Sequence, residues 1–247
     1  MMPVMLEGRT PLRHTDLTFE EAVGHVPFLR ALSPKQRELL EAIGEIRGMR
    51  PGEPAFTLGE PSREFVFLVR GHCKLVRTRD DGREVILDIR GPGDLLCAGA
   101  VTAFAPYCCS AIALDDDVAA IAFPRRDVNR LLEDHAPISA LFVREATGHE
   151  MRMAERVFEL SSGYVEQRIS ALLSRLADQM GVAGADGSVR IAVKLSRQDL
   201  ADLCGTTLES AIRTMTHLAR ENVVKTTRRG FLVSNRSQLE RLANRSG

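Results

Sequence analysis

Two charged residues near the carboxyl end of the sequence have the types and spacing to recognise DNA bases. Glu209 and Arg213 are four positions apart, so in a helix they lie on one face, one turn apart. An arginine can donate two hydrogen bonds to guanine, and a carboxylate can accept one from cytosine. The same spacing occurs in ordinary surface ion pairs, which stabilise a helix by only about 0.2–0.5 kcal/mol. The surrounding sequence has to decide between these interpretations.

The flanking residues predict two short helices that meet at a tight corner. Ser196 with Asp199 is a capping pattern that begins the first helix, and Gly205 ends it where the chain turns. Thr206 with Glu209 repeats the pattern and is expected to begin the second helix. Its inner face is expected to hold apolar residues: Ala211, Met215 and Leu218. Its outer face then holds polar and charged residues: Glu209, Ser210, Arg213 and Thr216.

The charge distribution favours DNA binding at this end of the chain. The whole sequence is neutral, with 33 Lys and Arg against 33 Asp and Glu. Residues 161–247 hold 13 basic and 8 acidic residues, whereas residues 1–160 hold 20 basic and 25 acidic ones. Because phosphate neutralisation by Lys and Arg supplies much of the affinity for DNA, the C-terminal part is the expected polyanion-binding part.

Composition and motifs exclude several other classes of protein. No run of about 18 apolar residues indicates a membrane span, and the first residues lack a secretory signal pattern, so a cytoplasmic protein without membrane contact is expected. The five cysteines include no CxxC pair, so we expect reduced thiols rather than a disulfide framework or a zinc site. Without a nucleophile elbow, a phosphate loop or an HExxH motif, the sequence predicts no enzyme.

The expected secondary structure changes along the chain. Between about Gly48 and Pro124, short apolar runs separated by Gly and Pro predict a small antiparallel barrel or roll. The expected strands are 65–69, 74–77, 85–89 and 118–123. Further on, residues 181–188 are expected to form a flexible turn and residues 189–195 a strand.

A long helix is expected between about Pro137 and Leu160, where apolar residues recur with helical period. Its stripe of Ala and Met suits a partner helix from a second copy of the chain. The alternative, that the stripe covers the β-domain, stays open. A break at Ser161-Ser162-Gly163 precedes a second amphipathic helix, whose apolar face is expected to hold Val165, Ile169, Leu172, Leu173 and Leu176.

The segment LSRQDLADLCGTTLESAIRTMTHLARENVVKTTRRGFLV resembles the winged helix-turn-helix of the cyclic-AMP receptor protein/fumarate-nitrate regulator (CRP/FNR) family of transcriptional regulators. The resemblance rests on Ala201, Gly205, the Glu209/Arg213 pair, the strand at Val223-Val224 and the wing turn Arg228-Arg229-Gly230. Upstream it continues through Gly71, Gly82 and Gly91-Pro92-Gly93-Asp94, so it covers the chain from about residue 25.

The resemblance implies an α+β fold with a cyclic-nucleotide-binding-like β-roll, a long dimerisation helix and a winged helix-turn-helix. The implied domains are a sensory domain over residues 1–136, a dimerisation helix and hinge over 137–162, and a DNA-binding domain over 163–247. The implied function is that of a homodimeric regulator that binds a palindromic operator in double-stranded DNA and contacts RNA polymerase. Activation or repression stays open.

Individual DNA-contacting residues also follow from the resemblance. Phosphate contacts are implied for Arg197, Gln198, Thr207 and Ser210. Base contacts are implied for Glu209 and Arg213, and further DNA contacts for Thr216, Arg228 and Arg229. Arg197 and Arg213 are both expected to project outward. Leu208 and Ile212 depart from the family's best-known members, so the operator need not match theirs.

The residues aligned with the family's cyclic-AMP pocket argue against that ligand. The effector-pocket candidates are Cys97, Ala98, Cys108, Cys109, Ser110 and Met153. Ala98 and Cys109 stand where a carboxylate and a guanidinium would be needed, and a buried phosphate without its arginine is an uncompensated charge. The sequence therefore predicts a signal other than cyclic AMP.

The cofactor and the signal stay open. An iron-sulfur cluster of the oxygen-sensing type is not expected, because no cysteine precedes Cys73. Haem stays open, since Cys97 aligns with a haem-ligating cysteine of one family member, although the exchange histidine corresponds to Gly99 and Pro3 follows two methionines. A thiol switch at the cysteines stays open beside the simpler interpretation that they are core residues, and no metal is assigned.

One alternative function remains beside transcription regulation. The chain would then be a cyclic-nucleotide-domain regulatory or interaction protein without specific DNA binding. Arg197, Glu209 and Arg213 favour the DNA-binding regulator, because these residues would have no role in such a protein.

Overall fold

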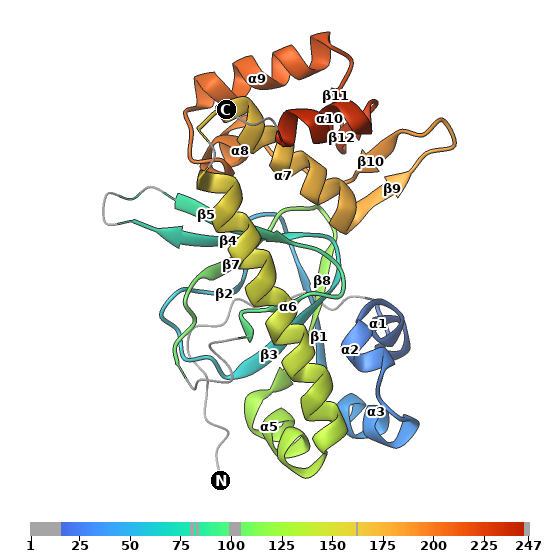
Figure 1. Cartoon of the computed structure of the whole chain (residues 1–247). Helices are drawn as coiled ribbons and strands as arrows, with labels where there is room; N and C mark the ends of the chain where they lie inside the picture. Colours follow the sequence, from blue (N-terminus) through green and yellow to red (C-terminus); the bar gives the residue numbers. More distant parts are fainter. Residues whose placement is uncertain (1–15, 80–81, 83, 99–104, 162, 245–247) are drawn as a thin grey trace. The chain divides into compact units, whose positions relative to one another are not determined.

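The computed structural model describes residues 16–79, 82, 84–98, 105–161 and 163–244 (Figure 1). Pro3, Gly99 and Ser162 lie outside the described residues. The chain divides into two compact units, residues 1–73 with 90–141 and residues 74–89 with 142–247. The expected domain boundaries after residues 136 and 162 stay predictions.

Three short helices open the first unit: α1 Phe19–His25, α2 Pro27–Arg30 and α3 Pro34–Glu41. Thr18 caps α1, because its hydroxyl accepts a hydrogen bond from the Glu21 backbone N–H at 3.2 Å while the Glu21 carboxylate accepts one from the Thr18 N–H at 2.7 Å. The unit also contains α5 Arg125–Asp134.

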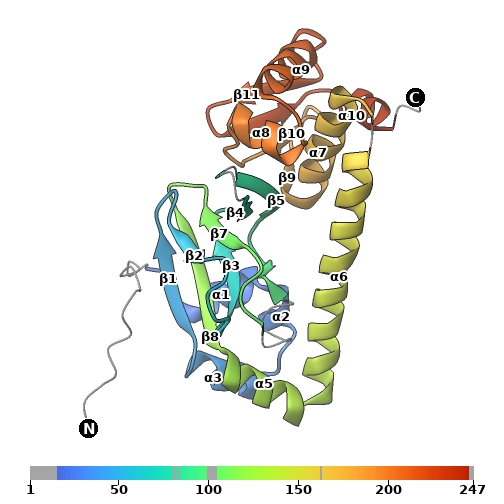
Figure 2. The same cartoon turned by 90° about the vertical axis from the view of Figure 1, so that its left-hand side faces the viewer.

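A four-stranded antiparallel sheet forms the core of this unit (Figure 2). Its strands follow the order β1 Glu45–Met49, β8 Val118–Pro124, β3 Glu64–Arg70 and β6 Leu95–Leu96. Phe67 of β3 lies opposite Ile121 of β8, and both are almost fully buried. The two central strands are apolar along nearly their whole length because both of their faces are covered.

A smaller antiparallel pair of strands positions Cys108 and Cys109. It consists of β2 Pro54–Phe56 and β7 Ser110–Ala113. Cys97 directly follows β6, and Cys108 and Cys109 directly precede β7. Residues 11 positions apart in the sequence are thereby brought to one place in the fold.

The second unit contains the strands β4 Cys73–Thr78 and β5 Glu84–Arg90, the helices α7 Val165–Met180, α8 Arg197–Leu203, α9 Leu208–Arg220 and α10 Arg236–Ala243, and a four-stranded sheet. The strands of that sheet, in spatial order, are β11 Val224–Thr227, β12 Gly230–Val233, β10 Val189–Ile191 and β9 Gly181–Ala183. The expected inner face of α7 is confirmed for Ile169, Leu172, Leu173 and Leu176, which are fully buried.

Two expectations for residues 181–195 are wrong in part. Residues 181–183 form β9, which pairs antiparallel with β10 and so makes a hairpin rather than a flexible turn. The strand expected over residues 189–195 ends at Ile191, which pairs with Phe231. Because Gly230 is the only residue of β12 beyond Phe231, β12 offers no partner to residues 193–195.

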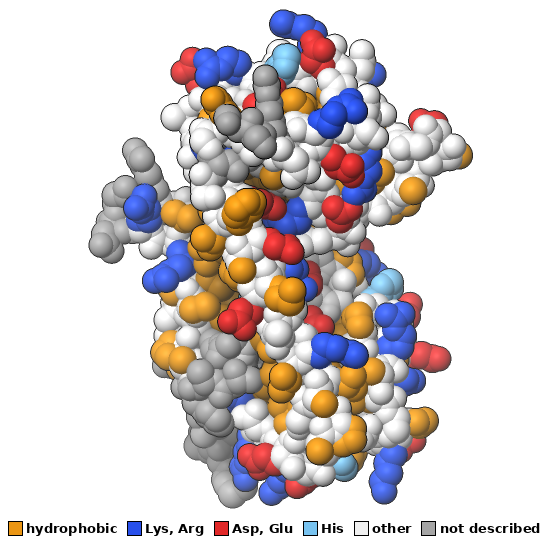
Figure 3. Space-filling view, viewed as in Figure 1, with side chains coloured by type: hydrophobic (Ala, Val, Ile, Leu, Met, Phe, Trp, Pro, Cys, Tyr) orange, Lys and Arg blue, Asp and Glu red, His pale blue; other side chains and the backbone are white. Residues whose placement is uncertain are grey.

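Helix α6 Ala136–Ser161 is a single long helix. At its start Ile138 and Phe142 are buried, with exposures of 1% and 4%. Further along, apolar side chains are exposed: Val143, Met151, Val157, Phe158 and Leu160. Figure 3 shows hydrophobic side chains on the face of this helix. In the described part of the single chain, these side chains therefore lie outside the hydrophobic core.

Candidate DNA interface and effector site

The first helix of the corner, α8, begins as the capping pattern predicts. The Ser196 hydroxyl accepts a hydrogen bond from the Asp199 backbone N–H at 3.0 Å, and the Asp199 carboxylate accepts one from the Ser196 N–H at 2.8 Å. Leu200, Ala201 and Leu203 are fully buried on its inner side. The reciprocal cap fixes where α8 starts, so its first residues face solvent in a defined register.

The second helix begins one residue later than the sequence predicts. Gly205 turns the chain with φ of +55°, a conformation that favours glycine. The Thr206 N–H still donates to the Ala201 carbonyl at 3.0 Å, so Thr206 belongs to the turn that follows α8. Thr207 takes the extended conformation of an N-cap, and its hydroxyl accepts from the Ser210 N–H at 3.2 Å. The cap is therefore Thr207 with Ser210, not Thr206 with Glu209.

The outer side of α9 carries a polar surface that we call the recognition face: Glu209, Ser210, Arg213 and Thr216. Glu209, Arg213 and Thr216 are exposed, whereas Ala211, Met215 and Leu218 on the opposite side are buried, as predicted. In the part of the chain that the structure describes, Glu209 and Arg213 form no ion pair with each other. Both charges of the pair therefore remain directed to solvent.

The wing, the turn between β11 and β12, flanks the first turn of α8. The Arg197 guanidinium donates to the Thr226 hydroxyl on β11 at 2.6 Å. Arg197 is half-buried, and burial lowers its pKa from the usual arginine value. The expectation that it projects outward holds only in part, because the side chain is half-buried and one of its donors is held by Thr226. Arg228 and Arg229 form the exposed wing turn.

Neighbouring polar groups on α8 and at the wing are also fixed. The Gln198 side-chain amide donates to the Asp202 carboxylate at 2.7 Å. Gly230 closes the wing with φ of +142°, and a Cβ there would lie 2.1 Å from the Ile191 carbonyl oxygen. Only glycine fits this approach of two backbones, so the wing keeps its place beside β10.

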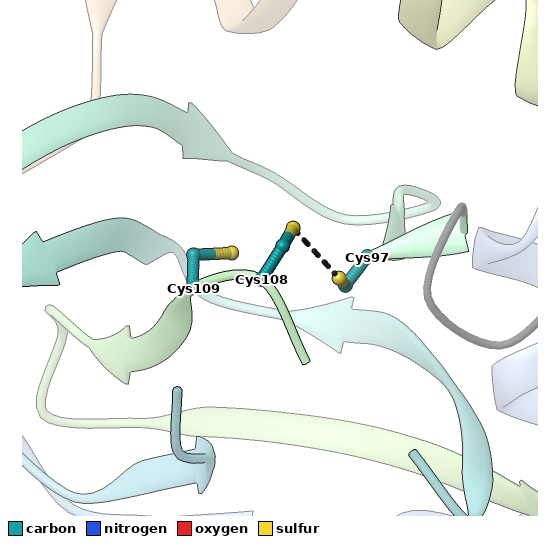
Figure 4. Close-up of side chains that lie close together, drawn as sticks. All are labelled: Cys97, Cys108 and Cys109. Atoms are coloured by element: carbon teal, nitrogen blue, oxygen red, sulfur yellow. Dashed lines mark hydrogen bonds between the residues drawn. The ribbon is translucent and has the colours of Figure 1, made fainter. Parts of the chain in front are cut away.

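The first unit contains a second group of residues that could react or bind a ligand. We call Cys97, Cys108 and Cys109 the thiol cluster (Figure 4). Their Sγ atoms all lie within 4.8 Å of one another, and those of Cys97 and Cys108 are 3.4 Å apart. Cys97 and Cys109 are buried, with exposures of 4% and 2%, whereas Cys108 is exposed. All three are free of disulfide bonds.

The environment of the thiol cluster favours neutral thiols. A hydrogen bond with Cys108 is the main cause that raises the pKa of Cys97, and a hydrogen bond with Cys108 raises that of Cys109, with burial adding to both. Two cysteines outside the cluster, Cys73 and Cys204, are fully buried core residues, and this burial raises the pKa of each to about 12.

The remaining effector candidates have simpler surroundings. Ala98 is buried with an exposure of 4%, and the Ser110 hydroxyl accepts a hydrogen bond from the Leu58 backbone N–H at 2.9 Å. Met153 is half-buried on α6, in the other compact unit, so its place beside the cysteines stays a prediction.

Comparison with known proteins agrees with this architecture. A model of the cyclic nucleotide-binding domain matches residues 46–135, and a model of the Crp-like helix-turn-helix domain matches residues 167–242. The chain is 25% identical over 192 residues to a CRP-like cAMP-activated global transcriptional regulator of Mycobacterium tuberculosis, covering 78% of this chain and 85% of that protein. The chain belongs to the CRP/FNR family of transcriptional regulators.

Other CRP/FNR relatives cover a similar share of the chain. The transcriptional activatory protein AadR of Rhodopseudomonas palustris is 27% identical over 217 residues, which covers 86% of this chain and 87% of AadR. The structure of FixK2 from Bradyrhizobium japonicum superimposes with a TM-score of 0.72 at 20% identity and covers 83% of this chain and all of that one. The predicted α+β fold with a nucleotide-binding-like domain and a helix-turn-helix is thereby confirmed.

Membership of the CRP/FNR family settles the class of protein. It is a transcriptional regulator with a helix-turn-helix DNA-binding domain and not an enzyme. Within the described residues, no helix is both long enough and apolar enough to span a membrane.

One polar network of this CRP/FNR chain was missed by the sequence analysis. Arg156 of α6 donates to the carbonyl oxygen of Leu203, the last residue of α8, and to the carbonyl of Leu87 at 3.4 Å. Arg175 of α7 pairs with Asp88 at 3.1 Å and with Glu159 at 3.0 Å. The three-residue spacing of Arg156 and Glu159 indicates an ion pair within one helix. Their other partners lie far away in the sequence, so spacing could not predict the network.

Proposed function

We propose that the chain binds a palindromic DNA operator as a homodimer, through the recognition face of α9, in response to a signal other than cyclic AMP. The observation that carries this proposal is the exposed Glu209 and Arg213 pair on a helix whose opposite face is buried in the DNA-binding domain. In the described residues the two side chains are not paired with each other, so no ion pair between them has to break when DNA binds.

We assign different tasks to the two helices of the corner. Arg213 donates two hydrogen bonds to guanine, and Glu209 accepts one from a neighbouring cytosine, so these residues select the sequence. Phosphate contacts belong to Arg197, Gln198, Thr207 and Ser210, with further contacts from Thr216, Arg228 and Arg229. Exposure supports this division, since Gln198 on the first turn of α8 and Thr207 at the start of α9 are both exposed.

The homodimer is proposed to form along α6. Val143, Met151, Val157 and Phe158 are between 61% and 78% exposed in the single chain, which is unusual for apolar side chains on one helix. A two-fold axis along paired α6 helices would place two α9 helices about 34 Å apart, one turn of DNA. The operator would then be an interrupted palindrome, and RNA polymerase is the proposed partner of the bound dimer.

The proposed signal is not cyclic AMP. Ala98 and Cys109 offer neither a carboxylate nor a guanidinium. A cyclic phosphate buried among these groups would lose its hydration without a compensating cation. We therefore propose that this chain differs from its mycobacterial relative, which is named as a cAMP-activated regulator.

The test is a selection of bound duplexes from a random DNA pool, followed by sequencing, with and without saturating cyclic AMP. We expect an interrupted palindrome to be enriched, and the affinity for it to be the same with and without the nucleotide. Enrichment of no sequence would favour the alternative of a regulatory or interaction protein without specific DNA binding. A gain in operator affinity on adding cyclic AMP, matched by calorimetric binding, would show that the pocket accepts the nucleotide.

A further inference from the structure

The thiol cluster is not among the residues proposed to contact DNA, and its three cysteines lie close together. Three sulfur atoms from two segments of the chain lie within 4.8 Å of one another. Figure 4 shows the side chains of Cys108 and Cys97 directed toward each other, with Cys109 beside them. Among the described residues, this group contains no histidine, aspartate or glutamate, so any ion held here would have sulfur ligands alone.

The spacing of the sulfur atoms suits a three-coordinate centre. A thiophilic ion with bonds of about 2.3 Å to three sulfurs in a plane needs sulfurs about 4 Å apart, and a pyramidal centre needs slightly less. The observed 3.4 Å between Cys97 and Cys108, and the limit of 4.8 Å for every pair, include these values. Only small side-chain movements would be needed to close the site.

The backbone also holds the cluster in place. Cys97 has a φ of +54°, in the left-handed region that non-glycine residues seldom adopt. Such conformations persist where the surrounding fold enforces them, and they concentrate at functional sites. Cys97 and Cys109 are buried and fixed, whereas Cys108 is exposed and gives an entry route from solvent.

We propose that Cys97, Cys108 and Cys109 bind one trivalent thiophilic metalloid, with arsenite as the probe, and that this ligand is the signal of the regulator. Its effect on operator affinity rests on the function proposed above, but its binding does not. Each of three As–O bonds of As(OH)₃ is replaced by an As–S bond. Each thiol proton leaves with a hydroxide as water, and arsenic stays trivalent, so no oxidant is needed.

Charge distinguishes the metalloid from other thiophilic ions. Three thiolates around As(III) give a neutral centre, whereas the same thiolates around Cu(I) leave two negative charges, which are costly to bury. Cys97 and Cys109 are buried, with exposures of 4% and 2%, so negative charge left on the centre would be poorly hydrated. Zinc is disfavoured because its closed sites take four ligands.

Disulfide formation is the competing chemistry at the same residues. The 3.4 Å between the sulfurs of Cys97 and Cys108 would allow it after a small movement. That reaction would require an oxidant that removes two electrons and would leave Cys109 unused.

The test measures arsenite binding to the full chain, kept reduced with a phosphine, by equilibrium dialysis with elemental analysis. X-ray absorption at the arsenic edge reports the ligands. We expect one arsenic per chain and three sulfur neighbours. Because Cys108 is exposed, Cys108→Ser should fold normally, lower affinity by roughly 100-fold and replace one sulfur neighbour by oxygen. Cys204→Ser is the matched control outside the cluster and should keep all three sulfurs if folded.

Several results would overturn the proposal. Binding of Cu(I) but not arsenite would reject the metalloid assignment, and loss of thiols in air without any arsenic binding would favour a redox switch. One bound arsenic per chain with unchanged affinity for a selected operator would reject its role as the signal. If the chain enriches no DNA sequence but binds arsenic through three sulfurs, the site stands and the proposed DNA function fails.

Discussion

The recognition face and the thiol cluster are built in opposite ways. Glu209 and Arg213 are exposed and supported from behind by buried residues of the same helix, so they contribute little to the stability of the fold. Cys97 and Cys109 are themselves part of the core, and their Sγ atoms lie within 4.8 Å of each other. Binding and folding are therefore separable on α9 but coupled at the cysteines. Substitutions on and around α9 can test how complete that separation is.

The largest effect is expected on the inner side of the same helix. Leu218 is fully buried, so Leu218→Ala should lower the free energy of unfolding by about 2–5 kcal/mol through lost burial and a cavity. Urea unfolding measures the change. Leu208→Ala is the matched control, because Leu208 lies on α9 but is 43% exposed. Equal losses of stability in the two variants would contradict the burial pattern.

The next effect concerns the proposed dimer. Phe158 is 78% exposed, so Phe158→Glu should leave the single chain folded but place a charge in the apolar α6 contact. Dimerisation should weaken by about 2–4 kcal/mol, as expected for a central aromatic contact. Sedimentation measures the dimer dissociation constant, and Phe158→Leu serves as the apolar control. A dimer of unchanged strength would place the interface elsewhere.

A smaller effect is expected on the recognition face itself. Arg213→Ala should cost roughly 1–3 kcal/mol of operator binding and relax the preference at one base pair per half-site, without a change in melting temperature. Titrations against the operator and its single-base variants measure this. Arg220→Ala removes the same charge at the other end of α9 and should keep the preference. If the Arg213→Ala protein folds and still discriminates fully between the operator and its single-base variants, Glu209 and Arg213 are ordinary surface residues.

The smallest effect is expected at Arg197. Arg197→Ala should weaken specific and nonspecific DNA alike and lower the magnitude of the salt slope by about one unit per half-site. Loss of the bond to Thr226 should add a stability cost of about 0.5–1.5 kcal/mol. Arg197→Lys keeps the charge and separates the two effects. A loss of affinity confined to the operator would make Arg197 a base-contacting residue.

Local patterns predicted the DNA-binding part well. The capping pair Ser196 and Asp199, and the inner residues of α9, depend only on neighbours within one or two turns of helix, and the structure confirms them. The second cap was misplaced by one residue, because Thr206 still bonds to the Ala201 carbonyl of the preceding helix. Such competition between two helix ends is not visible in spacing alone.

The sensor part was predicted less completely, because its elements are short and its contacts are distant. The apolar runs at 65–69 and 118–123 are found within β3 and β8, but β6 has only two residues and β7 four. These short strands bring Cys97 to Cys108 and Cys109. No periodicity joins residues on separate strands, so the sequence showed three candidate cysteines but not their meeting point.

The bond from Arg156 to the carbonyl of Leu203 has a consequence for how the chain can be divided. The last carbonyls of a helix have no partner within it, and here one of them is satisfied by a residue 47 positions earlier in the sequence. A fragment that starts after α6 would leave this carbonyl to water and would fray at the corner that orients α9. A truncation intended to isolate the DNA-binding part should therefore begin before Arg156, so that this bond is kept.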